Sequence, residues 1–370
     1  MKNTDRNIYI DVMKGLLIIL VVIGHLPFFD YDSRTLTLIY SFHMPAFLII
    51  GGMLSHIDEN TTFRSIIFKR IKGTLVPYFI FYLISFLIVR VNSKEKFIAA
   101  IKVVFRGIGD PINAINLPLW FLTFYFVAMV IFELIEYISY KVRKHFFKKK
   151  SYFYILILDL IIIIPIMYFS YKYSRIYKLK RLPFNVEIAA FCQLFIVFGK
   201  VCKEYIVNAY YKIKELKFIK YIIFYISIFI MIALTLVWYK SSMSNGRIDL
   251  NARDYKNAFY MYVNAILGFI IFAYFSYFIS KIPFVNYILS NIGKYSIYIL
   301  SYHVPSTIYT YGYIISNLPA IVGTTLSKNS LYSIITLSSF GILFSLIIAF
   351  FHETANLIYK NSKDNSNSKI

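Results

Sequence analysis

About ten apolar stretches, each close to 20 residues long, alternate with short basic loops along this chain of 370 residues. A helix of about 20 apolar residues crosses the hydrocarbon core of a bilayer. Hydrophobic residues make up 59% of the chain and aromatic residues 19%, which agrees with spanning helices anchored by aromatic belts. The sequence therefore predicts an all-α, polytopic membrane helix bundle, with spans at 9–28, 36–55, 73–90, 117–139, 152–171, 184–201, 218–239, 257–279, 295–317 and 331–353.

The basic residues set the expected orientation of these spans. Of the 40 Lys and Arg residues, the larger share lies in loops on the N-terminal side, and the loop at 141–150 is the richest. Positive charge accumulates on the cytoplasmic side of membrane proteins, so we expect a cytoplasmic N-terminus. One membrane domain is expected over 1–360, followed by a polar tail at 361–370 whose composition predicts disorder. We expect a multi-pass protein of the cell membrane, which for a bacterium is the inner or cytoplasmic membrane.

The net charge of +22 does not indicate a nucleic-acid partner. The charge lies in short loops between apolar stretches, where anionic lipid headgroups are the nearer partner. The two cysteines, Cys192 and Cys202, fall in or beside a predicted span and provide no disulfide framework. The six histidines are dispersed without an H-E-x-x-H motif, and no G-x-S-x-G motif occurs. We therefore expect no metal site, no permanently bound cofactor and no hydrolase triad.

Lys14 and His25 lie in the first predicted span with ten residues between them. In a helix this spacing covers about three turns, or about 16 Å, and places both side chains on one face. An ionisable residue inside a membrane helix costs about 3 kcal/mol to insert, which favours a position facing a protected interior. A cation at the membrane boundary and an imidazole deeper in the span suit an enzyme that holds an anionic carrier and moves protons. A purely structural role for His25 is the alternative.

His43, in the second predicted span, is expected at a depth similar to that of His25, because the two spans run in opposite directions. Histidine has an unperturbed pKa of about 6.5, so it can take up and return a proton near neutrality. Pro45 would disturb the second helix locally and free backbone carbonyls for polar partners. We predict that His25 and His43 are catalytic, with a structural role for His43 equally open when it is considered alone.

Basic residues also gather near the expected cytoplasmic ends of the first and third spans. They are Lys14, Lys69, Arg70 and Lys72. Such a cluster could hold phosphate groups, and Lys14, Arg70 and Lys72 are the candidates for that role. The positive-inside rule alone would place the same residues there. Asp11, one turn before Lys14, is expected to pair with it.

The stretch SNGRIDLNARDYKN at 244–257 is dense in hydrogen-bonding groups. Arg247, Asp249 and Asn251 alternate donors with acceptors, as a sugar-binding loop requires. An ordinary solvated loop has the same composition, and composition alone favours that simpler interpretation. Glu187, early in the sixth predicted span, is expected either to pair with a cation or to face a cavity that binds substrate.

Two other features leave alternatives open. His303, in the ninth predicted span and followed by Pro305, is a buried candidate for which a structural role is favoured. The segment 94–110 is either a short interfacial helix or a solvated, charged loop.

Segments along nearly the whole chain resemble, in order, the acyltransferase 3 family of membrane acyltransferases, and within it the fucose 4-O-acetylase-like group. The opening RNIYIDVMKGLLIILVVIGH resembles the family's first helix, with its basic residue, ten intervening positions and histidine. SFHMPAFLIIGGML resembles the second helix, although Gly51 stands where serine is common. The other similar segments are LPLWFL, LPFNVEIA, NGRIDLN and SIYILSYH.

One position departs from the family pattern. Relatives often carry two arginines three residues apart just before a helix that starts with a Leu-x-x-Pro-Tyr-like sequence. The matching positions here are Arg70 and Gly73, so the second arginine is missing. Lys69 or Lys72 could replace its charge, but lysine does not reproduce the planar fork of arginine.

The resemblance implies transfer of an acyl group, commonly acetyl, from a cytoplasmic acyl-CoA co-substrate to a hydroxyl of a surface carbohydrate or its lipid-linked precursor. His25 would be the general base or a transient acyl carrier, and His43 would orient the acceptor or assist proton transfer. Lys14, Arg70 and Lys72 would hold the CoA phosphates, while Glu187, Arg247, Asp249 and Asn251 would bind the sugar. The rival function is export of a polysaccharide or a lipid-linked sugar. A membrane sensor or structural subunit is the third reading.

Overall fold

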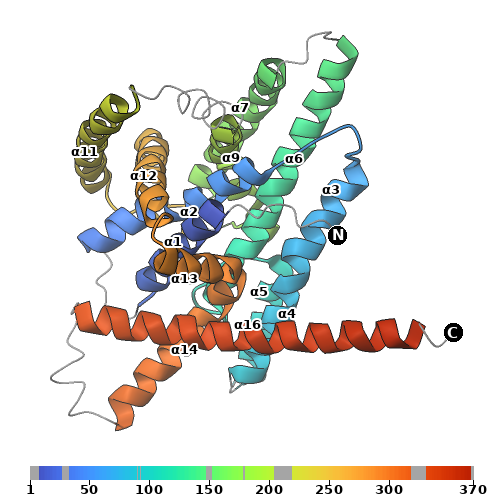
Figure 1. Cartoon of the computed structure of the whole chain (residues 1–370). Coiled ribbons are helices and arrows are strands. Elements are labelled where there is room, and N and C mark those ends of the chain that lie inside the picture. Colours follow the sequence, from blue (N-terminus) through green and yellow to red (C-terminus); the bar gives the residue numbers. More distant parts are fainter. Residues whose placement is uncertain are drawn as a thin grey trace. The chain divides into compact units, whose positions relative to one another are not determined.

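The protein is described by a computed structural model that covers residues 8–26, 33–89, 91, 93–146, 152–177, 180–203, 219–317 and 331–367 (Figure 1). Within these ranges the regular elements are helices, and the one piece of strand-like pairing is an isolated bridge between Asp249 and Asp254. Seven helices are long and apolar enough to cross a membrane, or eight if one bent pair forms a single span. These findings confirm the predicted all-α, polytopic membrane bundle.

The chain divides into two compact units, one formed by residues 1–31 and 273–370 and the other by residues 32–272. The first unit combines the N-terminal helix with the C-terminal helices. Its elements are α1 (Ile8–Gly24), α13 (Pro283–Lys294), α14 (Ser296–Asn317) and α16 (Leu331–Asn367), and α12 (Ala258–Ile279) crosses the unit boundary. α16 includes most of the polar segment 361–370, for which the composition predicts disorder.

In the first unit, α1 packs against α13 through glycines. A Cβ atom on Gly15 would overlap the carbonyl of Leu289, and one on Gly293 would overlap the carbonyl of Asp11. Backbones approach this closely only where one side chain is a hydrogen atom, as in helix pairs of membrane proteins. α13 is a helix that the span pattern does not predict, because its 12 residues are too few to cross a bilayer.

The second unit contains the remaining helices. In chain order they are α2 (Arg34–Leu54), α3 (Phe63–Arg70), η1 (Ile71–Leu75), α4 (Val76–Ile88), α5 (Lys94–Arg106), η2 (Leu117–Leu119), α6 (Trp120–Phe146), α7 (Tyr152–Ile176), η3 (Pro183–Asn185), α8 (Val186–Phe191), α9 (Gln193–Val201) and α11 (Ile219–Asn245). α3, the π-helical turn η1 and α4 follow one another directly, so the predicted span at 73–90 begins earlier than its apolar pattern suggests. α5 confirms the helical alternative for the segment 94–110.

The sixth predicted span, 184–201, is broken. α8 and α9 meet at Cys192 with a bend of 54°. Polar side chains satisfy backbone carbonyls at the break: the hydroxyl of Tyr262 donates to the carbonyl of Phe191, and Gln193 Nε2 donates to the carbonyl of Ala189 at 2.7 Å. A helix can be interrupted at membrane depth when such partners are present.

Two predicted spans do not meet the length and hydropathy expected of a crossing helix. α1 extends over 17 described residues, and α14 contains many Ser, Thr, Tyr and His residues that lower its mean hydropathy. Both nevertheless occupy the positions predicted for the first and ninth spans.

Candidate functional site

Three histidines share one local geometry. Nδ1 of His25 lies 2.8 Å from the carbonyl oxygen of Val21, Nδ1 of His43 lies 2.7 Å from that of Ile39, and Nδ1 of His303 lies 2.8 Å from that of Ile299. A carbonyl oxygen only accepts, so in each neutral ring we assign the proton to Nδ1. Nε2 then carries the lone pair that a base or nucleophile requires.

In the first unit, His25 has a second imidazole as its neighbour. The ring centroids of His25 and His303 are 5.1 Å apart, and the rings meet edge to face at 73°. His303 is fully buried, whereas His25 is half-buried. The sequence marks both residues separately, and the structure brings them together.

Lys14 lies three residues after Asp11 on α1. Its Nζ is 3.8 Å from Asp11 Oδ1, which confirms the pairing expected from the sequence. A pair of this kind at partial exposure contributes little stability. It leaves Lys14 as a localised positive charge in the first half of α1.

In the second unit, His43 forms a row with two other side chains. The ring of Tyr40 lies 4.8 Å from that of His43, and the guanidinium carbon of Arg247 lies 4.0 Å from the centroid of the Tyr40 ring. His43 is only 1% exposed. The predicted residues His43 and Arg247 thus contact the same tyrosine. Tyr40 is three positions before His43, on the same helix face, and that spacing is the sequence signal by which it could have been found.

Arg253 is the centre of a second polar group in this unit, the Arg253 cluster. Its Nε donates to Glu187 Oε1 at 3.1 Å, and its Nη2 also donates to Glu187 and, at 3.2 Å, to Asn185 Oδ1. Its Nη1 donates to the backbone carbonyl of Asn251, and Asn185 Nδ2 donates to the carbonyl of Gly107 at 2.9 Å. The predicted residues Glu187 and Asn251 therefore lie together, around an arginine that the sequence marks only as one of several charges in its loop.

Buried polar atoms without a protein partner occur in the Arg253 cluster and on Arg181, whose guanidinium lies within electrostatic range of it; among them are Glu187 Oε2, Asn251 Oδ1 and Arg181 Nη1. Burial, and after it the charge of Arg253, lowers the pKa of Arg181 from its ordinary value. Buried polar atoms are nearly always hydrogen-bonded, so a set of them without partners needs an explanation. Two are acceptors and one is a donor, which is the combination that a hydroxyl-bearing ligand satisfies.

Asp249 has a different environment from its neighbours in the loop. Its carboxylate accepts from the backbone of Ala252 at 3.0 Å, and its backbone pairs with that of Asp254. Its charge also acts on Arg181 and opposes the lowering of that pKa. Asp249 thus shapes the loop and adds negative charge beside the Arg253 cluster.

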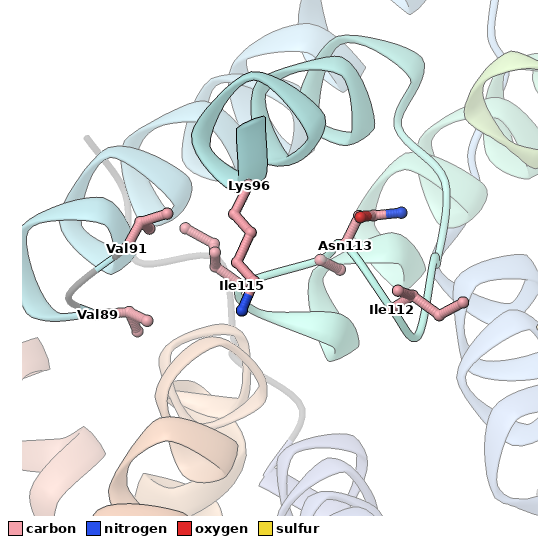
Figure 2. A pocket seen from close by; sticks show the side chains of 7 residues that line it. Val89, Val91, Lys96, Ile112, Asn113 and Ile115 are labelled. Carbon is pink, nitrogen blue, oxygen red and sulfur yellow. The ribbon is translucent and has the colours of Figure 1, made fainter. Parts of the chain in front are cut away.

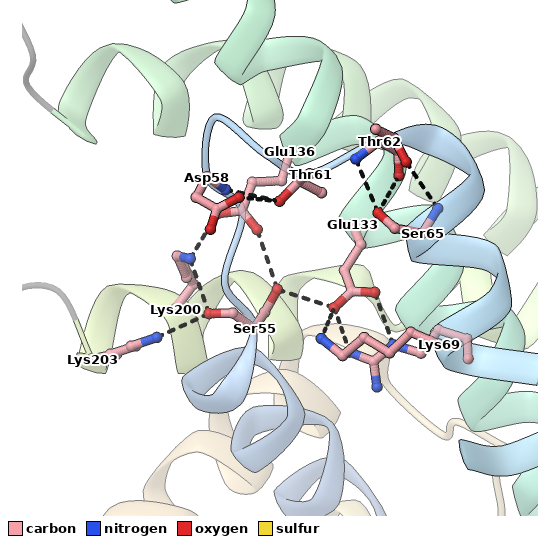
Figure 3. Close-up of polar contacts among 11 residues, drawn as sticks. Ser55, Asp58, Thr61, Thr62, Ser65, Lys69, Glu133, Glu136, Lys200 and Lys203 are labelled. Atoms are coloured by element: carbon pink, nitrogen blue, oxygen red, sulfur yellow. Dashed lines mark hydrogen bonds and ion pairs between the residues drawn. The ribbon is translucent and has the colours of Figure 1, made fainter. Parts of the chain in front are cut away.

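A third polar group, the Glu133 cluster, joins α2, α3, α6 and α9 (Figure 3). Arg70 Nε donates to Glu133 Oε2 at 2.8 Å, and Arg70 Nη2 pairs with Oε1. Lys200 Nζ lies 2.8 Å from Glu136 Oε1, and Ser55 Oγ donates to Glu136 Oε2 at 3.3 Å. Every oxygen of the two carboxylates has a partner, so Glu133 and Glu136 are saturated by the protein itself.

The predicted donor-binding residues of the second unit differ in their availability. Arg70 is engaged by Glu133, whereas Lys72 is exposed on η1. Gly73 has open space around the position of a Cβ atom, so an arginine there would meet no obstacle at its base.

A pocket of about 180 Å³ lies elsewhere in this unit, beside α5 (Figure 2). Its lining is mostly apolar: Val89, Val91, Lys96, Ile112, Asn113, Ala114 and Ile115. Lys96 is the one charged side chain in that lining, and none of the predicted site residues contributes to it. Among the described residues, no group of three His, Cys, Asp or Glu side chains is arranged to hold a metal ion.

Comparison with known proteins adds one match. The family model Acyl_transf_3, described as an acyltransferase domain, matches residues 7–354. No curated protein and no solved structure matches the chain. The match covers the histidines, the Glu133 cluster and the Arg253 cluster. The chain therefore belongs to the acyltransferase 3 family and is a multi-pass membrane acyltransferase.

Proposed function

We propose that this protein is an O-acyltransferase that moves an acetyl group from acetyl-CoA to a hydroxyl of a cell-surface carbohydrate or of its lipid-linked precursor. The observation that carries the acceptor assignment is the Arg253 cluster, with its buried donor and acceptors that lack protein partners. Sugar hydroxyls both donate and accept, so a single class of ligand would satisfy all three atoms.

The chemistry is assigned to His25. The transfer forms an ester bond between the acceptor oxygen and the acyl carbon, and breaks the carbon–sulfur bond of the thioester. The acceptor hydroxyl must lose a proton and the departing thiolate must gain one. In the ring of His25, the proton on Nδ1 is bound by the carbonyl oxygen of Val21. Nε2 is therefore the nitrogen suited to carry the transferred proton. The alternative is that Nε2 takes the acyl group first.

The acceptor would be bound by residues of the second unit. Glu187 and Asn251 supply acceptors, and Arg181 supplies a donor. Arg247 and Asp249 lie in the same loop, and through Tyr40 the guanidinium of Arg247 is linked to His43. His43 would then orient the acceptor or assist proton transfer.

The donor would be held through its phosphates by positive charge. The candidates from the sequence are Lys14, Arg70 and Lys72. Arg70 is already paired with Glu133, so we expect Lys72 to be the main positive charge that contacts the phosphates in the second unit. Arg70 would contribute while it stays paired with Glu133.

The test uses the full-length protein in nanodiscs with labelled acetyl-CoA and purified surface glycan. We expect wild-type protein to transfer label to the glycan, and His25→Ala and His25→Gln to lose at least about 100-fold in turnover. His56→Ala is the matched control, because the side chain of His56 is 69% exposed in a loop. Glycan movement across a vesicle membrane without label incorporation would instead support the exporter. Wild-type turnover in both His25 variants would remove His25 from the chemistry.

A further inference from the structure

The segment 107–116, which joins α5 to η2, contacts the Arg253 cluster near its start and lines a pocket further along. A Cβ atom on Gly109 would overlap the side-chain amide of Asn251, so the two residues are in direct contact. Residues 112–115 line the pocket of about 180 Å³ beside α5. The three steps of chain from Gly109 to Ile112 span at most about 11 Å. The pocket therefore begins within the length of one or two sugar rings from the Arg253 cluster.

The turn between these two contacts is fixed by its own side chains. Asp110 Oδ1 accepts from the backbone N–H of Ile112 at 2.9 Å, and Asp110 Oδ2 accepts from Asn113 Nδ2 at 2.9 Å. At the end of the segment, Asn116 Nδ2 donates to Ser85 Oγ on α4 at 2.9 Å. The pocket and the Arg253 cluster therefore keep a defined spacing, as two subsites for one ligand require.

The lining of the pocket combines apolar side chains with one positive charge. Most of the lining residues are Val or Ile, and Lys96 is the charged one. Figure 2 shows the Lys96 side chain extending from α5 towards Ile115, with Val91 on one side and Asn113 on the other. Lys96 is exposed, and no carboxylate pairs with it in the part of the chain that the structure describes. A lysine ammonium group beside apolar surface is suited to a phosphate group that is joined to a hydrocarbon chain.

α5 has the surface of a helix that lies along a membrane. It belongs to the connection between the candidate spans Phe63–Leu87 and Leu117–Phe146, so it lies at a membrane boundary. Phe105 is 70% exposed and Phe97 is 44% exposed, although both are apolar. The same helix carries four basic residues: Lys94, Lys96, Lys102 and Arg106. Amphipathic basic helices lie at the headgroup level of a bilayer, so the pocket beside α5 is at the depth of lipid phosphates.

We propose that this pocket binds the phosphate and the first carbons of the lipid chain of a lipid-linked acceptor, while the sugar of the same molecule reaches the Arg253 cluster. The inference rests on the proposed function and selects the lipid-linked precursor over the finished carbohydrate as the acceptor. The volume of about 180 Å³ is below the roughly 300–1,000 Å³ of sites that enclose a whole small molecule, so the pocket fits one end of a longer ligand. An ordinary membrane phospholipid has the same phosphate and chain, but it has no sugar to satisfy the open atoms of the neighbouring cluster.

The experiment measures acetyl transfer by the full-length protein in nanodiscs to two matched acceptors. One is the lipid-linked saccharide extracted from the source cells, and the other is the same saccharide released from its lipid by mild acid. For Lys96→Gln, we expect the KM for the lipid-linked acceptor to rise about five- to tenfold, because one charge-assisted contact with the phosphate is lost. The KM for the released saccharide, which has no phosphate, should not change.

Two further variants separate the pocket from the rest of the helix surface. Lys102→Gln removes a charge from an exposed position of α5 outside the pocket lining, and it should leave both KM values unchanged. Ile112→Asp places a negative charge in the lining at a side chain that is 88% exposed, so the protein should still fold. It should raise the KM for the lipid-linked acceptor by at least about tenfold, because the new carboxylate repels the phosphate.

The outcomes separate the inference from the proposed function. If Lys96→Gln leaves both KM values unchanged, raises them equally or is matched by Lys102→Gln, the pocket does not bind the lipid carrier and the proposed function stands. A phospholipid that copurifies with wild type and is lost from Lys96→Gln, without a change in either KM, would identify an ordinary membrane lipid as the occupant and overturn the inference. If wild type binds acetyl-CoA but transfers acetyl to neither acceptor, the proposed function fails and the inference fails with it.

Discussion

The Glu133 cluster and the Arg253 cluster are both built from buried carboxylates and cations, but they differ in how far the protein satisfies their glutamate oxygens. Both oxygens of Glu133 and both of Glu136 have protein partners, and lysines also bond to the carbonyl of Ser55. In the Arg253 cluster, one oxygen of Glu187 and the side-chain oxygen of Asn251 are left without partners. Equal burial and similar charge therefore do not imply equal roles. The carboxylates of Glu133 and Glu136 are used to hold helices together, whereas under the proposed function the open atoms of the Arg253 cluster would bind the acceptor.

The largest effect is expected from a substitution in the Glu133 cluster. Glu133→Gln should lower the free energy of unfolding by about 3 kcal/mol, because Arg70 would lose the charge that compensates its burial. Denaturation in nanodiscs measures this. The control is Glu59→Gln, whose pair with Lys144 is exposed, and it should change stability by less than about 1 kcal/mol. An equal loss in the two variants would contradict the structural role of the Glu133 cluster.

The next effect concerns the packing that brings Lys200 to the Glu133 cluster. A Cβ atom on Gly199 would overlap the carbonyl of Ile49, so Gly199→Ala should force α2 and α9 apart and cost about 1–3 kcal/mol. Gly73→Ala is the control, since nothing lies near a Cβ atom there. Similar melting temperatures for the two variants would show that close approach of α2 and α9 is not required.

A smaller effect, on substrate binding, is expected from a substitution in the Arg253 cluster. Asn251→Ala removes an amide that packs on Gly109 and whose Oδ1 has no hydrogen-bond partner in the protein, so stability should change by about 1 kcal/mol or less. The KM for the carbohydrate acceptor should rise about five- to tenfold, because one hydrogen bond to the ligand is lost. Steady-state kinetics measures this, with the exposed Asn60→Ala as the matched control. If Asn251→Ala destabilises the protein and leaves the KM for the acceptor unchanged, the Arg253 cluster has a structural role and does not bind the acceptor.

The smallest effect tests whether the phosphates of acetyl-CoA bind near η1. Gly73→Arg restores the second arginine of the family pattern at a position with open space. We expect the KM for acetyl-CoA to fall about two- to fivefold, in line with one added charge-assisted contact at partial exposure. Gly73→Gln adds a long side chain without a charge, so it should not lower the KM for acetyl-CoA. An unchanged KM with arginine would place the donor phosphates away from η1.

Much of the fold follows from the sequence because apolar runs of membrane length are a direct signal. The ten predicted spans each coincide with a helix or, for 184–201, with the bent pair α8 and α9. The sequence does not predict the bend at Cys192, since one of the bonds at the break comes from Tyr262, 71 residues after Phe191. α13 was not predicted because a short amphipathic helix has no hydropathy signature of its own.

The candidate site was predicted less completely, for a different reason. Residue types identified His25, His43, Glu187 and Asn251 as candidates. Their partners come from segments far apart in the sequence: Arg253 bonds to a glutamate 66 residues earlier. The pairing of His25 with His303 likewise arises only once α14 packs near α1. Sequence spacing carries no information about such contacts.

The hydrogen bond from Nδ1 to the preceding turn, shared by three rings, has a further consequence for selectivity. A neutral ring anchored in this way keeps its lone pair on Nε2, the nitrogen that is not bound to its own helix. Phosphate and carboxylate oxygens are repelled by such a lone pair while the ring is neutral, whereas a hydroxyl group or an electron-poor carbonyl carbon is accepted. Under the proposed function, a catalytic imidazole anchored in this way would favour uncharged reacting groups over the charged parts of the molecules that carry them.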